Sequence, residues 1–576
     1  MQRFLTVVLL MISPVVLKAQ QGLVWHTPKW VNGVAKRDTA HMFYRLPAEM
    51  KSRVSKNVWD LSLFTTGEFL HFRTGARHFE VRYQLSGKHR EMPHMPATGV
   101  SGVDLFAKDR LGRWNWASPY YSFGDTVVYS YKHLKIDAGA EVDYYLYLPL
   151  YNTVSWISIV TDEGVKVEFL RERKEKPIVG YGTSIMHGAV ASRPGLSWTN
   201  ILSRKLDREV INLGFSGNGR FEAPIFDLMA TVDAAVYLFD CMPNLTRANP
   251  DTVEARIRYG VNKLRTAHPG VPIIFTEYPC GDIPYYMDSS LINDRHNSSQ
   301  VIAAVYKKLK TEGVTNIWLL TEKEIGFDIN STTEHTHPND IGMMKYADAY
   351  ENKIREILRE PVGQFTTQQP VAQNDNRYDW MLRHDEIKEQ VRKTNPSAVI
   401  FANSIIHLWG GAPVTDTFRR NGPKAWERYI QPKKVQNAGF GSDRIENVLW
   451  RIYHGELDHF NGKKIIVMIG TNNLAVNSDE EIVAGLQLLL QQIRKRKPEA
   501  ELTMIGILPR RKREERVRVL NEKIRLMAEA GDYRFVDYSP YFLKGNKANE
   551  DLFIGDGLHP DEEGYSILGK QLQQIL

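Results

Sequence analysis

The sequence predicts a multidomain α/β protein, with a β-sandwich at the front followed by two domains that each contain a parallel sheet. Residues 22–171 are rich in aromatic and β-branched residues broken by Gly, Pro and Asp, a pattern typical of an all-β unit. From Pro177 onward, short continuous apolar runs alternate with segments of helical length, and this rhythm starts again after residue 379. The 576 residues suffice for three or four domains of about 100–200 residues each.

The composition excludes several classes of protein. With 43% hydrophobic and 24% charged residues, the chain is neither collagen-like, low in complexity nor wholly disordered. Lys and Arg number 74 against 67 Asp and Glu, a net charge of +7 without a long basic block, so a nucleic-acid partner is not expected. Two cysteines are too few for a disulfide scaffold or a multi-cysteine zinc site.

The first residues predict export. A basic start that includes Arg3 precedes an apolar run over residues 4–17, which is shorter than the roughly 20 residues of a membrane span. Residues 1–19 therefore fit a secretory signal peptide cleaved after Ala19, the alternative being a buried N-terminal helix. No cysteine follows that would carry a lipoprotein anchor, and no later segment is apolar enough to span a membrane. We expect a secreted or periplasmic protein that is soluble after cleavage.

The front block, residues 20–174, is expected to form the β-sandwich. Apolar residues alternate with polar ones over residues 79–85 and 165–169, which places one apolar face on each strand. Four aromatic residues have two possible roles, core or edge packing and a platform on which carbohydrate stacks: Trp114, Trp116, Tyr120 and Tyr121.

Two α/β blocks follow, residues 175–358 and 380–576, joined by residues 359–379, whose Pro, Gln and Thr content is typical of a linker. Continuous apolar strands predict a sheet covered by helices on both faces. The expected strands are 178–181, 210–213, 235–239, 273–275 and 316–320 in the first block, and 398–401, 435–438, 465–469, 502–507 and 534–536 in the second. The second block is thus interpreted as a divergent repeat of the first.

Polar residues that could carry chemistry follow the strands in the same order in both blocks. The intervals between corresponding residues are similar, and a carboxylate lies three residues before each final His, so coincidence is a poor explanation. The corresponding residues are Ser184, Gly217, Asn244, Glu334 and His337 in the first block, and Ser404, Ser442, Asn472, Asp556 and His559 in the second.

These residue types in this order point to acyl transfer. A serine hydroxyl becomes a nucleophile when a His accepts its proton, and the His needs a carboxylate to fix its tautomer. The tetrahedral intermediate needs donors aimed at its oxyanion, which backbone N–H groups and an Asn amide supply. Ligands of open α/β sheets bind at the carboxyl ends of the strands, where these residues lie. Met186 and Ile406 replace the final Gly of G-x-S-x-G, which argues against an ordinary α/β-hydrolase.

Both blocks resemble SGNH (GDSL-type) hydrolases, over residues 175–357 and 380–576. The second is similar to platelet-activating-factor acetylhydrolase-like members at residues 437–441, 446–451 and 470–473. Residues 102–106, Gly-Val-Asp-Leu-Phe, resemble the GxDLY module found in front of such esterases. The resemblance implies flavodoxin-like domains with five-stranded parallel sheets, ester substrates, and a mechanism without metal or cofactor.

The resemblance also implies a role for each matched residue. Ser184 and Ser404 would be nucleophiles, with His337 and His559 as general acid/bases. Glu334 and Asp556 would orient the histidines. The oxyanion donors would be the N–H groups of both serines together with Gly217, Asn244, Ser442 and Asn472.

Three positions depart from the family pattern. Glu334 stands where Asp is usual and adds a methylene, Ser442 replaces a Gly, and Ala402 replaces a Gly two residues before Ser404. None of them removes the charge or the backbone N–H that the mechanism needs. Taken singly, each serine could also be a helix cap, each Asn a turn residue and each His-Pro a loop end.

Three further features of the sequence have more than one interpretation. His335-Thr-His337 has metal-like spacing but lacks an accompanying Cys or carboxylate cluster, so no metal is expected. Residues 509–516, Pro-Arg-Arg-Lys-Arg-Glu-Glu-Arg, predict a solvated helix start, with contact to an anionic polymer as the alternative. Cys241 and Cys280 follow neighbouring strands, and a disulfide between them is a hypothesis.

Many exported members of the family that both blocks resemble remove acetyl groups from carbohydrates. With this resemblance, the sequence predicts an exported serine esterase that removes acetyl or other small acyl groups from carbohydrates at two sites. One alternative is a lipase or lysophospholipase. Another is a glycan-binding protein in which one or both sites are inactive. The expected partner is an acylated poly- or oligosaccharide; the sugar, the ester position and the oligomeric state stay open.

Overall fold

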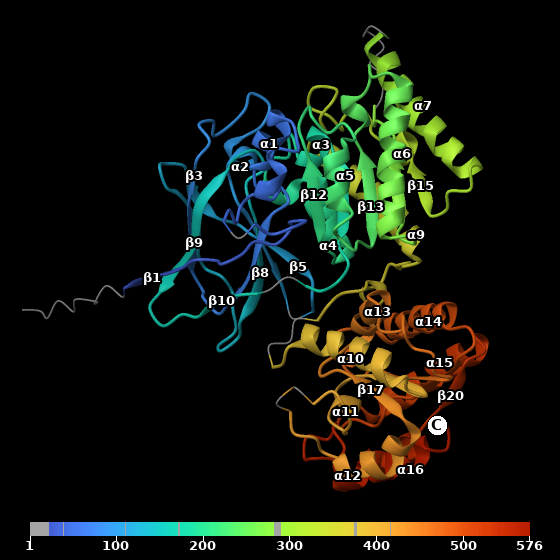
Figure 1. Ribbon diagram of the computed structural model, residues 1–576. Coiled ribbons are helices and arrows are strands. Elements are labelled where there is room, and N and C mark those ends of the chain that lie inside the picture. Colours follow the sequence, from blue (N-terminus) through green and yellow to red (C-terminus); the bar gives the residue numbers. More distant parts are fainter. Residues whose placement is uncertain are drawn as a thin grey trace, which may run out of the picture.

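The computed structural model describes residues 22–38, 40–109, 111–170, 173–280, 290–373, 377–414, 416 and 418–576. For residues 290–292 it describes the backbone but not the side chains. The predicted signal peptide, residues 1–19, lies outside the described residues. Among the described helices, not one combines the length and the apolar character that crossing a membrane requires. Figure 1 shows three bodies: a β module in blue, a green α/β domain beside it, and an orange-red α/β domain below.

The β module consists of two five-stranded antiparallel sheets, in the orders β1-β9-β3-β7-β6 and β10-β2-β8-β4-β5. In β3, alternate side chains are buried and enter the core between the sheets, as the period-two pattern predicts. The strands are β1 (Leu23–His26), β2 (Phe69–Thr74), β3 (Phe79–Leu85), β4 (Asp104–Lys108), β5 (Trp114–Ala117), β6 (Tyr120–Ser122), β7 (Val127–Tyr131), β8 (Val142–Tyr147), β9 (Val154–Asp162) and β10 (Val167–Phe169), with helices α1 (Lys56–Ser62) and α2 (Ala97–Val100).

The first α/β domain, domain 1, has a parallel sheet in the order β12-β11-β13-β14-β15. Its strands are β11 (Ile178–Gly182), β12 (Val210–Gly214), β13 (Val236–Asp240), β14 (Ile273–Thr276) and β15 (Ile317–Leu320). Its helices are α3 (Ser184–His187), α4 (Trp198–Leu206), α5 (Ala223–Met229), α6 (Pro250–Ala267), α7 (Ser290–Thr311), α8 (Glu322–Ile325) and α9 (Asp340–Leu358).

Domain 2 repeats this topology in the order β17-β16-β18-β19-β20. Its strands are β16 (Ala398–Ala402), β17 (Val435–Gly439), β18 (Lys464–Met468), β19 (Glu501–Ile505) and β20 (Arg534–Val536), with a small hairpin β21 (Leu543–Lys544) and β22 (Lys547–Ala548). Its helices are α10 (Trp380–Thr394), α11 (Ser404–His407), α12 (Pro423–Ala425), α13 (Ile445–Tyr453), α14 (Asp479–Arg496), α15 (Glu514–Ala530) and α16 (Glu562–Leu572).

Helices cover both faces of the domain 2 sheet. Val399 and Phe401 enter one core with residues of α10, α13, α14 and α15, whereas Ile400 and Ala402 enter a second core with residues of α11 and α16. Both faces are therefore apolar, which explains why the strand reads as a continuous apolar run. The predicted fold class, a β-sandwich followed by two five-stranded parallel α/β domains, is confirmed.

The GxDL segment joins the β module to domain 1. One carboxylate oxygen of Asp104 accepts hydrogen bonds from Arg193 Nη1 at 2.6 Å and Gly195 N at 2.9 Å, and the other accepts from Trp116 Nε1 at 2.7 Å. Trp114 Nε1 donates to Arg204 O at 3.0 Å. These two tryptophans thus have structural contacts at the domain boundary.

The other two aromatic residues of the expected platform behave differently. Tyr120 and Tyr121 lie on the edge strand β6, where 67% and 54% of their surfaces are exposed. They stay candidates for contact with carbohydrate.

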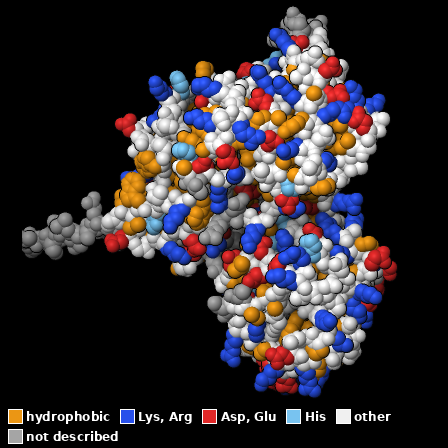
Figure 2. All heavy atoms as spheres, viewed as in Figure 1, with side chains coloured by type: hydrophobic (Ala, Val, Ile, Leu, Met, Phe, Trp, Pro, Cys, Tyr) orange, Lys and Arg blue, Asp and Glu red, His pale blue; other side chains and the backbone are white. Residues whose placement is uncertain are grey.

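The segment between the α/β domains is packed against both. Thr367 is buried and donates to Glu481 O at 2.6 Å, and Ala372 N donates to Asp207 at 3.1 Å. Despite its linker-like composition, the segment therefore has fixed contacts with both domains. On the face seen in Figure 2, basic and acidic side chains are interspersed over the α/β domains.

Candidate active sites

The first site, site 1, forms where β11 ends. Thr183 caps helix α3 by accepting from Ile185 N, which starts the helix at Ser184 directly after the strand. The loop after β12 lies against this strand end, since Phe215 N donates to Gly182 O at 3.0 Å. A Cβ on Gly219 would lie 2.0 Å from Gly182 O, so this close approach requires glycine.

Site 1 contains a continuous Ser–His–carboxylate chain. Ser184 Oγ lies 2.8 Å from His337 Nε2, although 153 residues separate them in the sequence. The other ring nitrogen, Nδ1, is hydrogen-bonded to Glu334, which also accepts from the backbone N–H of His337 at 2.9 Å. Because Nδ1 faces a carboxylate, it carries the ring proton, and Nε2 is left to accept from the serine hydroxyl. The additional methylene of Glu334 is accommodated without loss of this contact.

Two expected oxyanion donors, Gly217 and Asn244, belong to segments that pack on each other next to the end of β11. Gly217 has a left-handed backbone, with φ of 69°, in the loop after β12. The carboxamide oxygen of Asn244 accepts from the N–H groups of Asn218 and Gly219, both at 3.1 Å. This holds Asn244 against the glycine loop and leaves its NH2 group as a donor.

The second site, site 2, contains the same Ser–His–carboxylate arrangement, with Asp in place of Glu. Asn403 caps α11, and Ser404 Oγ lies 2.8 Å from His559 Nε2. His559 Nδ1 lies 2.5 Å from Asp556, which also accepts from the backbone N–H of His559 at 2.9 Å. Burial raises the pKa of Asp556, but hydrogen bonds from His559 and from Leu558 N–H outweigh it and hold the pKa below the ordinary value.

Ser442 takes the backbone conformation of its counterpart Gly217. Its φ is 63°, against 69° for the glycine. Its hydroxyl contacts Arg377. Asn472 Nδ2 donates one hydrogen bond to Asp443 O at 2.9 Å, which leaves its second amide hydrogen available. Ala402, at the third departure from the family pattern, is buried and accepts from Phe440 N.

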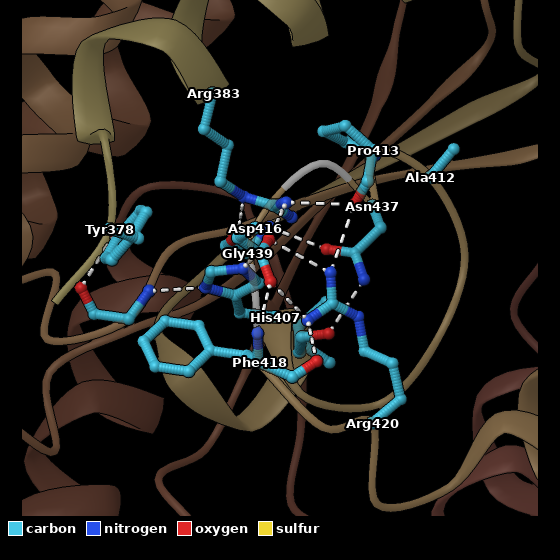
Figure 3. A network of polar contacts seen from close by, with 12 residues as sticks. Tyr378, Arg383, His407, Ala412, Pro413, Asp416, Phe418, Arg420, Asn437 and Gly439 are labelled. Atoms are coloured by element: carbon cyan, nitrogen blue, oxygen red, sulfur yellow. Dashed lines mark hydrogen bonds and ion pairs between the residues drawn. The ribbon is translucent and has the colours of Figure 1, made fainter.

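Figure 3 shows a buried network of hydrogen bonds and ion pairs around His407 and Asp416, next to site 2. His407, three residues after Ser404, accepts from Gly441 N through Nδ1 and therefore donates to Asp416 through Nε2, both at 2.8 Å. Burial lowers the pKa of His407 to about 4, although Asp416 opposes the shift. The histidine is thus neutral at pH 7 and fixes the oxyanion loop relative to Ser404.

Arg383 completes this network. Its Nε donates to Gly439 O at 2.9 Å and its Nη1 lies 3.2 Å from Asp416, while its guanidinium packs over Phe440. Burial lowers the pKa of this arginine to about 10, which still leaves it charged at pH 7. It satisfies the carbonyl at the end of β17, next to the loop that contains Ser442.

In site 1 the β module supplies the equivalent contacts. Arg45 donates to Gly214 O at 2.9 Å and packs over Phe215, the residues that correspond to Gly439 and Phe440. His187, the counterpart of His407, donates through Nε2 to Leu150 O of the β module at 2.8 Å. Domain 1 therefore depends on another part of the chain for contacts that domain 2 makes within itself.

Sequence reasoning missed these supporting residues. A signal for the histidines was present, because both blocks contain Ser-x-x-His. Arg45 and Arg383 carry no such signal, since they belong to unrelated segments.

The hypothesis of a disulfide is wrong. Cys241 and Cys280 are buried free thiols, and each donates to a separate backbone carbonyl at 3.5 Å, Tyr181 O and Tyr278 O respectively. Neighbouring strands bring their backbones together, but the side chains contact different groups.

Among the described residues, Cys280, His296 and Glu322 could hold a metal ion, since their ligand atoms lie within 4.8 Å of one another. His296 and Glu322 are already paired at 3.3 Å, and the group shares no residue with either Ser–His–carboxylate chain. His335 and His337 do not form this site.

The comparisons decide the family. Over 213 residues, 36% of this chain, the sequence is 30% identical to human platelet-activating factor acetylhydrolase IB subunit alpha1, and the match spans 85% of that protein. The chain belongs to the GDSL-type (SGNH) hydrolases. This confirms the resemblance that the sequence motifs indicated, and it makes the chain an ester hydrolase.

Each region of this GDSL-type hydrolase has its own match. Residues 175–355 and 403–567 match GDSL-like Lipase/Acylhydrolase families, and residues 23–167 match the GxDLY module described as the N-terminus of SGNH hydro-type esterases. Rat platelet-activating factor acetylhydrolase IB subunit alpha2 is 26% identical over 209 residues, 35% of this chain and 85% of the relative. A GDSL-like lipase structure from Bacteroides ovatus is 26% identical with a TM-score of 0.53, covering 59% of this chain and 98% of that one.

Proposed function

We propose that the protein is an exported esterase with two working sites, in which Ser184 and Ser404 attack small acyl esters of carbohydrates. The observation that carries the proposal is the serine-to-histidine distance of 2.8 Å in both sites, each backed by a carboxylate on the opposite ring nitrogen. Two independent occurrences of this geometry in one chain argue for retained function in both.

The mechanism uses groups already in contact. His337 or His559 takes the proton of the serine hydroxyl as Oγ bonds to the ester carbonyl carbon, and the carboxylate stabilises the imidazolium. The same histidine then gives the proton to the departing sugar hydroxyl. Water, deprotonated by the histidine, attacks the acyl-enzyme, and the acid leaves as the serine recovers its proton.

The oxyanion would be held by backbone and amide donors. In site 1 these are the N–H groups of Ser184 and Gly217 with the Asn244 amide; in site 2, the N–H groups of Ser404 and Ser442 with the Asn472 amide. Removing one such donor typically costs about 10²–10³-fold in kcat.

The openness of the sites supports a polymeric carbohydrate as substrate. The carboxylates of Glu334 and Asp556 are 43% and 40% exposed, so the catalytic loops lie at the surface and a chain in solvent could reach them. The acetyl group is supported by the name of the relatives, which are acetylhydrolases. Export follows from the predicted signal peptide over residues 1–19.

A lipid ester is the second candidate, and one observation favours it. Ile329, Ile341 and Met344, which are 76%, 53% and 44% exposed, lie near the loop that holds Glu334 and His337. Such side chains could contact an acyl chain. Comparing p-nitrophenyl acetate with long-chain p-nitrophenyl esters separates the candidates, because a lipase gains rate with chain length and an acetylesterase loses it.

The decisive experiment is acyl release from a panel of acetylated glycans by the wild type and by Ser184→Ala, Ser404→Ala and the double variant. We expect each single variant to retain part of the activity and the double variant to lose all of it. Complete loss of every activity in either single variant would contradict the proposal that the two sites work independently. Glycan binding without turnover by the wild type would show that the sites are inactive.

A further inference from the structure

The loop after the fourth strand of domain 2 carries a run of basic residues. In domain 2, β19 is followed by an apolar stretch and then by Arg510, Arg511, Lys512 and Arg513 in succession. The loop lies at the carboxyl end of the domain 2 sheet, where site 2 forms.

The basic loop is held against the catalytic loop of site 2. Arg511 N donates to Gly557 O at 3.0 Å, next to Asp556. A Cβ on Gly557 would lie 2.6 Å from the Arg511 side chain, so the two loops are in close contact. Arg511 itself pairs with Glu550 and donates to Gly555 O at 3.0 Å. Its charge is compensated, and it serves to fix the loop.

Arg510 lies between the oxyanion side and the acid side of site 2. Its Nη1 donates to the carbonyl of Thr471, the residue before Asn472, at 3.0 Å. Partial burial and the neighbouring Arg513 lower the pKa of Arg510, and the field of the Asp556 carboxylate opposes this shift. The side chain is half-buried, so its charge is only partly screened by water.

Three positive charges of this loop have no acidic partner in the part of the chain that the structure describes: Arg510, Lys512 and Arg513. Of the nearby acids, Asp556 binds His559, Glu550 binds Arg511 and Glu515 binds Arg518. Glu514 accepts from Ala548 N at 3.4 Å and is one negative charge against the three positive ones. The side of site 2 formed by this loop therefore carries an excess of positive charge that attracts an anion.

We propose that Arg510, Lys512 and Arg513 form an anion subsite, and that site 2 takes acylated sugars which carry a carboxylate or sulfate near the ester. This inference rests on the proposed function of site 2 as an esterase.

The test uses the full chain with Ser184→Ala, so that only site 2 turns over. An acetylated oligouronide is compared with the same oligosaccharide after its carboxyl groups are reduced to alcohols, and a sulfated acetylated oligosaccharide distinguishes sulfate from carboxylate. We expect kcat/KM to favour at least one charged substrate about 10-fold at low salt and the preference to shrink as ionic strength rises.

Substitutions in the loop test whether it causes the preference for charged substrates. Lys512→Gln with Arg513→Gln should raise KM for the charged substrate and leave p-nitrophenyl acetate hydrolysis unchanged. Arg510→Lys, which keeps the charge, should retain more of the preference than Arg510→Gln. The matched control is Arg525→Gln, an arginine farther along α15 that pairs with Glu522 and Glu529, which should change nothing.

The possible failures can be told apart. Turnover of p-nitrophenyl acetate without preference for either charged sugar would overturn the anion subsite and leave the esterase proposal intact. An equal loss with charged and neutral substrates in the loop variants would show a structural role and also overturn it. Absence of turnover with every ester in the Ser184→Ala protein would refute site 2 as an esterase, and the subsite with it.

Discussion

Arg45 and Arg383 occupy equivalent positions next to the two candidate sites, although Arg45 belongs to the β module and Arg383 to helix α10 of domain 2. Each donates to the last carbonyl of the strand before the oxyanion loop, Gly214 O or Gly439 O, at 2.9 Å. Each is almost fully buried, with 1% and 2% of its surface exposed. The β module is thus a structural part of site 1.

This equivalence predicts site-selective losses. Arg45→Met leaves several carbonyls at the module boundary unpaired, and each hydrogen bond to a charged group is worth about 1.5–3 kcal/mol. We expect activity at site 1 to fall about 10- to 1,000-fold, by displacement of the oxyanion loop, with site 2 unchanged. Arg383→Met should have the reverse effect. Fluorophosphonate labelling rates of the Ser184 and Ser404 peptides in one sample measure both sites.

The two variants control each other. Equal losses at both sites in either variant would indicate general unfolding, and the more conservative Arg45→Lys would then be compared. If that variant, folded by circular dichroism, also affected both sites equally, the assignment of Arg45 to site 1 would be wrong.

The shared positive φ of Gly217 and Ser442 predicts that they can be exchanged. A Cβ at Gly217 meets nothing within 4 Å, so Gly217→Ser carries only the strain of a left-handed residue, about 1–2 kcal/mol. We expect site 1 to lose less than about tenfold in kcat by this change. Gly217→Val should be far more damaging, because β-branched residues avoid this conformation. Kinetics in the Ser404→Ala background measure site 1 alone; equal damage by Ser and Val would contradict the prediction.

The hydrogen bond of Glu334 to His337 Nδ1 predicts a strong dependence on its charge. Glu334→Gln keeps the length of the side chain but favours the wrong histidine tautomer, so we expect kcat at site 1 to fall by about 10²–10⁴. The kcat of Glu334→Asp should lie between those of the wild type and Glu334→Gln, because the shorter side chain withdraws from both the His337 ring and its backbone N–H. Asp556→Asn is the matched change in site 2. Unchanged kcat in Glu334→Gln would remove this residue from the proposed mechanism.

The raised pKa of Asp240, at the end of β13, predicts how the stability of domain 1 varies with pH. Burial raises its pKa to about 7, although the hydroxyls of Tyr346 and Tyr350 donate to it. An unfolded Asp titrates near pH 4, at about 3.9. Between about pH 4 and 7 the folded state therefore keeps a proton that the unfolded state has released, so stability falls as pH rises through this window and levels off above it.

Pulse proteolysis in urea, with domain 1 peptides quantified by mass spectrometry, measures this trend. The loss is at most about 4 kcal/mol, since one unit of pKa shift corresponds to about 1.4 kcal/mol. Asp240→Asn should remove most of the pH dependence. A variant with the same slope as the wild type would show that another group is responsible.

Local sequence signals predicted the fold and the Ser–His pairs that the structure brings together, for physical reasons. Strands buried on both faces must be continuously apolar, and the apolar runs of the sequence coincide closely with β11 to β20. Ser184 and His337 were paired by motif order, which repeats in Ser404 and His559. The Arg45 contact arises only when the β module docks on domain 1, and no local pattern encodes it. The supposed disulfide failed because strand adjacency fixes backbones but not the direction of the Cys241 and Cys280 side chains.

The central claim, that both serines are nucleophiles activated by their histidines, is tested most directly by fluorophosphonate labelling of the native protein, with the adducts located by peptide mass spectrometry. The account predicts two adducts per chain, on Ser184 and Ser404, and their separate loss in His337→Ala and His559→Ala. An unlabelled protein, or labelling at these serines that persists without the histidines, would contradict it.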